Sequence, residues 1–226
     1  MIRSRSEDGV RVVTLDRPER RNALTPGALE TLAAVLDDAT EPVLYLHGEG
    51  DAFCAGADLD VVADLNRERA VEFAELGQQV ANAFESYDGA VVAGIDGAAR
   101  GGGVELALAC DVRVGTPDAT LAESGVSLGL FGAWGGTTRL QDVVGAGMAM
   151  DLALSGRVLG AEEALHCGLL TRIQSDPRVV ASEIAANDAQ AVRVIKRRLR
   201  DTSPRPEQEA READAFGDLV ARVEFD

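Results

Sequence analysis

The pattern of apolar and polar positions divides the chain into short strands and helices. β-branched and other apolar residues fill Val10–Leu15, Val43–His47 and Ala90–Ile95, and such runs predict strands. Between them, apolar residues recur at helical spacing over residues 27–38 and through most of residues 61–87. This alternation of strands and helices predicts an α/β fold, although the spacing is too irregular to form a sequence repeat.

The second half of the chain becomes progressively more helical. A helix is predicted to start within residues 135–144. After Pro177 the pattern is helical, apart from a break at Ser203–Pro206. No linker rich in Pro and Ser separates two halves. We therefore place only a soft boundary near Arg172. Further predicted strands cover residues 112–114, 120–122 and 169–173, and further helices cover residues 145–154 and 161–167.

A glycine-rich turn lies at the centre of the chain. Gly101–Gly103 follow a predicted strand and precede a short apolar helix that carries Glu105 in its first turn. Glycines at a helix start leave amide N–H groups accessible, and the helix dipole favours a negative oxygen there. A carboxylate beside such a site can transfer protons. A tight turn without a ligand is the alternative. A phosphate loop is less favoured, because no Lys-Ser/Thr pair follows the glycines.

A second stretch of small residues offers amides in the same way. Ala52–Leu59 follows the strand at Val43–His47, contains a glycine and ends beside an acidic residue. Like the glycine triplet, this segment has no bulky side chains that would block its amides.

Charge narrows the class of partner. The 38 acidic residues outnumber the 22 basic ones, the net charge is −16, and Lys196 is the only lysine. These values argue against nucleic acid as a partner. Abundant carboxylates with arginine in place of lysine are typical of proteins from salt-accumulating microbes, and an ordinary acidic cytosolic protein is the alternative.

Neither a membrane span nor a metal site is expected. No apolar run approaches the roughly 20 residues that cross a bilayer, and MIRSRSEDGV lacks an apolar signal region, so we expect a cytoplasmic protein. Cys54, Cys110 and Cys167 show no CxxC spacing and are interpreted as free, buried thiols. The two histidines are too scattered to bind a metal.

Four motifs in order carry a family resemblance. RPERRNAL, AFCAGADL, AARGGGVELALACDVRV and GAWGGTTRL resemble the enoyl-CoA hydratase/isomerase (crotonase) superfamily, over about Val10 to Arg200. The resemblance implies a crotonase-like spiral of ββα turns over residues 1–172, with a C-terminal helical region at 173–226 used in oligomerisation. It implies homotrimers or dimers of trimers, acyl-CoA substrates of fatty acid metabolism, and no cofactor beyond the CoA of the substrate.

The resemblance also assigns the binding residues. By motif match, the amides of Ala55 and Gly102 form the oxyanion hole. CoA is expected along Ala23 and the stretch Ala55, Gly56, Ala57, Asp58 and Leu59. Arg20 or Arg21 is expected to meet CoA phosphate, and a solvated arginine loop is the alternative.

The catalytic acids depart from the family pattern. Glu105 matches the first of the two glutamates of the hydratases, with a buried structural carboxylate as the alternative. Gly125 stands where the second glutamate is expected, which argues against simple two-glutamate hydration. Glu123 lies two residues earlier, and in extended backbone it would point to the same face. It is either a substitute catalytic acid or a surface acid.

Three functions remain open from the sequence. The first is an enzyme of the hydratase/isomerase family that stabilises a thioester enolate. The second is a carboxyacyl-CoA decarboxylase, because AWGGTTRL resembles a stretch of ethylmalonyl-CoA decarboxylase and decarboxylation requires no water attack. The third is a non-catalytic acyl-CoA-binding relative. Retention of Glu105 beside Gly101–Gly103 favours an enzyme.

Overall fold

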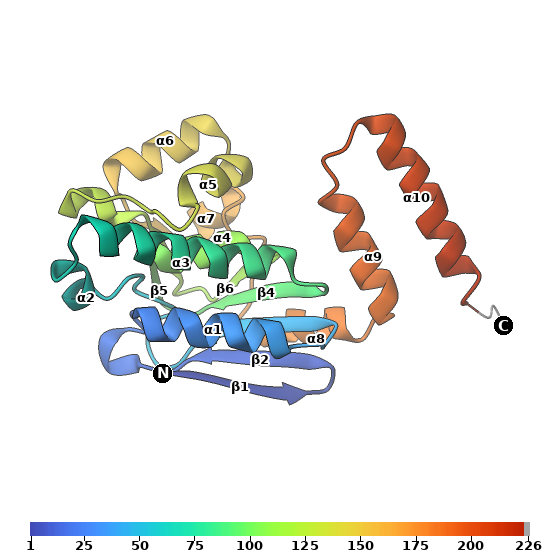
Figure 1. The fold of residues 1–226 in the computed structure, drawn as a ribbon, viewed down its shortest axis with the longest axis horizontal. Helices are drawn as coiled ribbons and strands as arrows, with labels where there is room; N and C mark the ends of the chain where they lie inside the picture. Colours follow the sequence, from blue (N-terminus) through green and yellow to red (C-terminus); the bar gives the residue numbers. More distant parts are fainter. Residues whose placement is uncertain (224–226) are drawn as a thin grey trace.

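A computed structural model describes residues 1–223 as a layered α/β fold around a six-stranded sheet (Figure 1). The strand order is β1-β2-β3-β4-β6-β9, and all neighbours are parallel except β1 and β2. A smaller sheet has the order β5-β7-β8. The strands are β1 (Ile2–Glu7), β2 (Val10–Leu15), β3 (Val43–Gly48), β4 (Ala90–Ile95), β5 (Ala98–Arg100), β6 (Val112–Gly115), β7 (Thr120–Ala122), β8 (Leu159–Gly160) and β9 (Arg172–Ile173).

Helices cover both faces of the large sheet (Figure 1). They are α1 (Pro26–Asp38), α2 (Leu59–Ala63), α3 (Arg67–Ser86), α4 (Gly102–Ala109), α5 (Gly136–Val144), α6 (Ala146–Ser155), α7 (Ala161–His166), α8 (Arg178–Ala185), α9 (Ala189–Leu199) and α10 (Arg205–Val220). Two 3₁₀ turns, η1 (Pro18–Arg20) and η2 (Ser124–Leu128), complete the elements.

The sheet separates two apolar cores because successive strand residues point to opposite faces. Val13 and Leu15 of β2 pack into the larger core with α1 and α3, whereas Val10 and Val12 pack into the smaller core against α8. Helix α4 is buried along its whole length. Burial on all sides fixes both ends of α4, and its N-terminus is where the glycine-rich turn lies.

Most of the predicted elements are confirmed. The predicted strand at Val10–Leu15 and the one at Ala90–Ile95 have the predicted bounds, and Thr25 caps α1 by accepting from the amide of Ala28. The helix predicted within 61–87 is broken, because Asn66 caps α3 through the amide of Arg69.

Four strands differ from the prediction. The strand predicted at 169–173 is reduced to β9, and the unpredicted β5 and β8 are three and two residues long, too short for a period to be visible. Strand β1 was not predicted because it is an edge strand with mostly exposed polar residues, so it lacks the apolar signal of a core strand.

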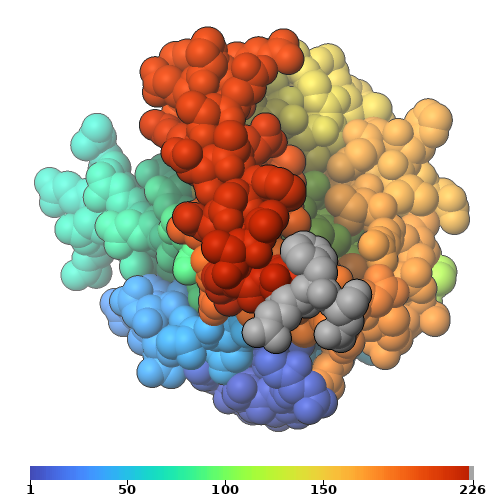
Figure 2. Space-filling model, turned by 90° about the vertical axis from the view of Figure 1, so that its right-hand side faces the viewer, coloured from blue at the N-terminus to red at the C-terminus, as the bar shows by residue number. Residues whose placement is uncertain are grey.

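The C-terminal helices divide into two kinds. Helix α8 packs on the sheet through buried Val180 and Ala181, whereas α9 and α10 form a pair at one side of the molecule (Figures 1 and 2). No residue of α10 within the described chain is buried, and Leu199 at the end of α9 is 82% exposed. The boundary near Arg172 stays a prediction. No helix within residues 1–223 is long and apolar enough to cross a membrane.

Candidate active site

Two turns that are distant in sequence meet at the N-terminus of α4. A β-bridge joins Cys54 to Ala99, and a Cβ at Gly56 would lie 2.8 Å from the amide nitrogen of Gly102. Gly56 has a φ of 85° and Gly101 a φ of 45°, so both turns use left-handed backbone that favours glycine. The two segments that the sequence singled out are therefore brought together.

A cavity of about 300 Å³ opens where these turns meet. Apolar side chains of α2 and α3 and the segment after η2 form most of its wall. Its lining residues are Ala55, Ala57, Leu59, Val62, Leu65, Ala70, Phe73, Ala74, Gly101, Gly102, Glu105, Ser124, Gly125, Leu128, Leu130, Phe131, Gly132, Ala133 and Trp134. The cavity thus has the size and apolar character of a small-molecule site.

The backbone amides at this cavity correct one prediction. The N–H of Ala55 donates to the carbonyl of Arg21 at 2.9 Å, so the assignment of Ala55 as an oxyanion donor is wrong. On either side of Ala57, the carbonyl of Gly56 accepts from the amide of Leu24, and the amide of Asp58 donates to the carbonyl of Leu24. Neither Ala57 nor Gly102 donates its own N–H to any group within residues 1–223. These two amides are the unpaired donors that the two predicted turns offer to the cavity.

Glu105 is held in place by the segment before α5. Its Oε1 accepts hydrogen bonds from the amides of Trp134 and Gly136, both at 2.7 Å, and the residue is 2% exposed. A Cβ at Gly132 or Gly136 would lie within 2.9 Å of this side chain, so both glycines are needed to admit the carboxyl group. The GAWGG motif, Gly132–Gly136, therefore forms a cradle around the carboxyl group of Glu105.

The protonation of Glu105 is poised near neutral pH. Burial raises its pKa to about 7, and the two amide hydrogen bonds and the charge of Arg139 partly oppose that rise. A carboxyl group with such a pKa can both accept and return a proton under physiological conditions.

Glu123 is buried, so the surface-acid alternative is wrong. The residue follows β7, is 8% exposed, and its Oε1 has no hydrogen-bond partner within the described residues. Burial, and then the charge of Glu105, raise the pKa of Glu123 to about 8. Glu123 does not line the cavity, whereas Ser124 and Gly125 do.

The predicted CoA-binding acid and arginine are engaged elsewhere. Asp58 is 2% exposed, accepts from Arg17 at 2.5 Å and caps α2 through the amide of Asp60. The hydrogen bond from Arg17 is the main cause of the lowered pKa of Asp58. Arg20 pairs with both Asp58 and Asp60. The side chain of Asp58 is therefore structural, and Arg20 would have to leave its partners to meet a phosphate.

Of the remaining predicted binding residues, Ala57 and Leu59 line the cavity, whereas Arg21, Ala23 and Gly56 do not. Ala23 is buried, and Leu59 is 55% exposed on the cavity wall. Arg21 is exposed, with a φ of 50°. No described side chain of the lining set is basic, so a negative charge on the acyl group of a ligand would lack a counter-ion there.

Sequence reasoning missed Trp134, the sole tryptophan of the chain. Its indole ring is 4% exposed and packs edge-on against Phe73, with ring centroids 5.7 Å apart. Cβ atoms at Gly77 and Gly102 would lie 2.1 and 2.3 Å from the ring. The available signal was the isolated large residue within GAWGG, whose partners are distant in sequence.

Comparisons with known proteins identify the family. A family profile described as "Enoyl-CoA hydratase/isomerase" matches residues 5–221. A crotonyl-CoA hydratase from Syntrophomonas wolfei is 34% identical over 224 residues, covering 93% of this chain and 86% of the relative. An enoyl-CoA hydratase from Bacillus anthracis superposes with a TM-score of 0.91 at 30% identity, covering 97% of this chain and 91% of that one.

A second solved structure agrees. An enoyl-CoA hydratase from Thermoplasma volcanium GSS1 superposes with a TM-score of 0.92 at 28% identity. The superposition covers 97% of this chain and 92% of that chain. The fold is thus the crotonase fold that the motifs implied. With a profile match over nearly its whole length and relatives of this similarity, the chain belongs to the enoyl-CoA hydratase/isomerase family and is an acyl-CoA thioester enzyme of that family.

Proposed function

We propose that the enzyme moves a proton at the α-carbon of an enoyl-CoA, with Glu105 as the transferring group. The thioester oxygen would lie between the amides of Ala57 and Gly102, where the negative charge of an enolate develops. The observation that carries the proposal is one cavity lined by both unpaired amides and by a carboxyl group with a pKa of about 7. Preorganised donors of this kind stabilise an oxyanion by roughly 2.7–4 kcal/mol each.

The same site supports either hydration or isomerisation. Hydration delivers a proton to the α-carbon and a hydroxyl group to the β-carbon, so it needs a positioned water. Isomerisation moves a proton between two carbons of the acyl chain and requires a single acid–base group. The relatives named above are hydratases, which favours hydration, whereas Gly125 supplies no carboxylate for the water. No cofactor is required for either reaction.

A carboxyacyl-CoA decarboxylase is the second candidate. Loss of CO₂ leaves the same enolate, which then takes one proton, so one acid and two amides suffice. Gly125 and the apolar cavity wall favour this chemistry, because a carboxylate held away from counter-ions is destabilised and its loss becomes easier.

A panel of thioesters separates these reactions. Crotonyl-CoA, a 3-enoyl-CoA and ethylmalonyl-CoA would be offered in molar KCl, and product formation followed by mass spectrometry. We expect turnover of an enoyl-CoA and its loss by roughly 10²- to 10⁴-fold in Glu105→Gln. Glu162→Gln, on an exposed face of α7, is the matched control and should retain activity. Binding without turnover of any thioester would identify a non-catalytic relative instead.

We also propose a homotrimer, or a dimer of trimers, located in the cytoplasm. Apolar side chains on α9 and α10 support an assembly, since Ile195, Leu199 and Phe216 are 55%, 82% and 70% exposed. Light scattering in high salt should give the trimer mass or twice that mass. Phe216→Asp should shift it towards the monomer, whereas Glu212→Gln on the same helix should not. A monomer mass for the wild-type chain would contradict the proposal.

A further inference from the structure

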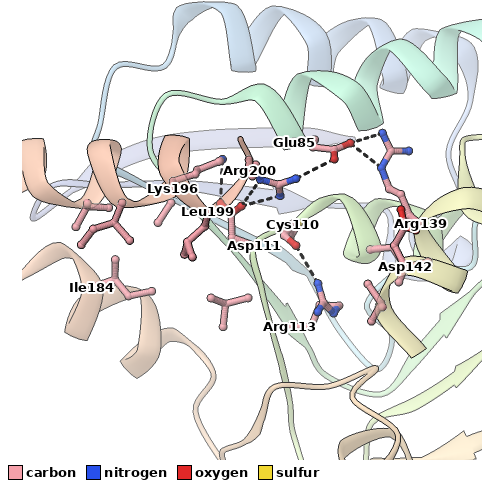
Figure 3. Close-up of a pocket in the computed structure, with 16 residues that line it drawn as sticks. Glu85, Cys110, Asp111, Arg113, Arg139, Asp142, Ile184, Lys196, Leu199 and Arg200 are labelled. Carbon is pink, nitrogen blue, oxygen red and sulfur yellow. Dashed lines mark hydrogen bonds and ion pairs between the residues drawn. The ribbon is translucent and has the colours of Figure 1, made fainter. Parts of the chain in front are cut away.

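A second cavity of about 560 Å³ lies between α9 and the helices α4 and α5, and a row of ion pairs crosses it (Figure 3). The two cavities share no lining residue. At one end of the row, Asp111 accepts from Lys196 and Arg200 of the α9 region. At the other end, Arg139 of α5 projects towards Glu85.

Glu85 joins the two ends. Its Oε1 accepts from Arg200 at 2.8 Å, and its Oε2 accepts from Nε and Nη2 of Arg139 at 2.9 and 2.7 Å (Figure 3). The side chains of Arg139 and Asp111 are 12% and 18% exposed. Arg200 and Glu85 are 34% and 39% exposed, so the pair between them is open to solvent, whereas the Arg139 and Asp111 ends of the row are better shielded and less screened.

Arg139 continues the row into the active site. Its Nη1 donates to the carbonyl of Trp134 at 3.2 Å, and the amide of the same Trp134 donates to Glu105. A Cβ at Gly135 would lie 2.1 Å from Nη1 of Arg139, so the guanidinium group lies directly over the cradle. Nε2 of Gln78 donates to the carbonyl of Ala133, the preceding residue, at 2.8 Å.

We propose that Arg139 is a positioning residue that holds the cradle segment Gly132–Gly136 around Glu105, and that Glu85 and Arg200 link this segment to helix α9. The docking of α9 would then influence the geometry of the proton-transfer group. This inference rests on the proposed role of Glu105. It predicts that disturbing Arg139 or Arg200 alters Trp134 and Glu105 together, without any contact to substrate.

The charged groups around Glu105 define what a titration should show. Glu123 faces it from the end of β7, and Arg139 acts on it from α5. Glu85 on α3 acts through its bonds to Arg139, and Arg100 on β5 is bonded to Thr120 and its own strand. Of these, the cation of Arg139 favours the ionised form of Glu105, so its removal should raise the pKa of Glu105.

Trp134 fluorescence gives a readout that does not depend on turnover, since it is the sole tryptophan. In the wild-type chain, emission should titrate with a midpoint near the Glu105 pKa of about 7, and Glu105→Gln should abolish that transition. Arg139→Gln should raise the midpoint by roughly half a pH unit or more. Arg139→Lys keeps the charge but loses the fork of contacts, so its midpoint should stay near the wild-type value while acrylamide quenching increases.

Kinetics and a matched control complete the test. If an enoyl-CoA is turned over, Arg139→Gln should lower kcat by roughly 10- to 100-fold with little change in KM. Arg200→Gln should shift the midpoint upward by less than Arg139→Gln. Arg157 also bridges two carboxylates, Asp151 and Glu163, and has no hydrogen bond to the cradle among the described residues, so Arg157→Gln should change neither midpoint nor quenching.

Two results would overturn the inference. A transition in Arg139→Gln identical to wild type would remove Arg139 from the positioning role, and an Arg200→Gln variant identical to wild type would remove the link to α9. Absence of turnover with every thioester would contradict the proposed function but leave the fluorescence result intact, so the two failures are distinguishable.

Discussion

The indole ring of Trp134 occupies the space in which any side chain at Gly102 would begin, since a Cβ there would lie 2.3 Å from a ring carbon. Gly102 is therefore required for packing as well as for its amide. Gly102→Ala keeps the N–H but forces the indole to move. We expect a loss of about 1–3 kcal/mol in the free energy of unfolding, measured by urea denaturation followed by circular dichroism. Gly147→Ala in α6, where a Cβ meets nothing within 4 Å, should be neutral or slightly stabilising.

A double-mutant cycle tests whether the indole is the cause. In a Trp134→Ala background the space is open, so adding Gly102→Ala should cost much less than it does in the wild-type chain. An equal cost in both backgrounds would show that Gly102 is needed for another reason.

Glu123 makes stability depend on pH. Burial and the charge of Glu105 raise its pKa from the ordinary 4.5 to about 8, so between these values the folded chain holds a proton that the unfolded chain has released. Stability should therefore fall as pH rises through this window. Glu123→Gln cannot ionise, and its loss of stability from about pH 5 to about pH 8 should be smaller by on the order of 2–4 kcal/mol.

The measurement is urea unfolding at a series of pH values. Glu162→Gln, which removes an exposed carboxylate, should follow the wild-type curve. Parallel curves for wild type and Glu123→Gln would show that Glu123 is not held neutral by burial.

The sequence predicted the two turns but not how they face each other. Glycines and small residues mark a turn because of their own backbone freedom, so Gly101–Gly103 and Ala52–Leu59 were recognisable locally. Which amide remains unpaired depends on a distant carbonyl, that of Arg21, and the sequence pattern holds no trace of that contact. The assignment therefore fell on Ala55 in place of Ala57.

The same limit applies to the acids and the arginine. The position of Glu105 in the first helical turn was predictable from its spacing to the glycines. The amides that hold its carboxyl group belong to Trp134 and Gly136, about 30 positions further along the chain. Arg139, which donates to the carbonyl of Trp134, is equally distant in sequence. Burial of Glu123 depends on the packing of β7 within the small sheet, and the alternation of an acid-rich sequence cannot distinguish it from a surface acid.

The net charge of −16 predicts a fold that depends on salt. Carboxylates crowded on a surface repel one another, and molar KCl shortens the screening length to about 3 Å. Salt also weakens exposed ion pairs, but each of these contributes little. We therefore expect the melting temperature to rise steeply from dilute buffer to molar KCl, measured by circular dichroism. A flat melting temperature over that range would contradict the adaptation to high salt that the composition indicates.

Gly125 is the position at which a second carboxylate could be restored. It lines the cavity with Glu105, and a Cβ there would lie 3.3 Å from the backbone of Leu130 and Phe131, so the segment needs to yield by only a few tenths of an ångström. If the missing carboxylate limits hydration, Gly125→Glu should raise the hydration rate of crotonyl-CoA by roughly 10- to 100-fold. Gly125→Gln has the same size without the charge and should give no such gain.

Glu123→Gln decides between the two acids. If Glu123 already stands in for the missing glutamate, hydration by the wild-type chain should be fast and should fall sharply in this variant. If Glu105 acts alone, wild-type hydration should be slow and Glu123→Gln should change it little. The kinetics of crotonyl-CoA hydration in Glu105→Gln, in Glu123→Gln and in the double variant measure this directly. Fast wild-type hydration that survives Glu123→Gln would show that a second carboxylate is not needed, because Glu105 would then be sufficient to position the water and deliver the proton.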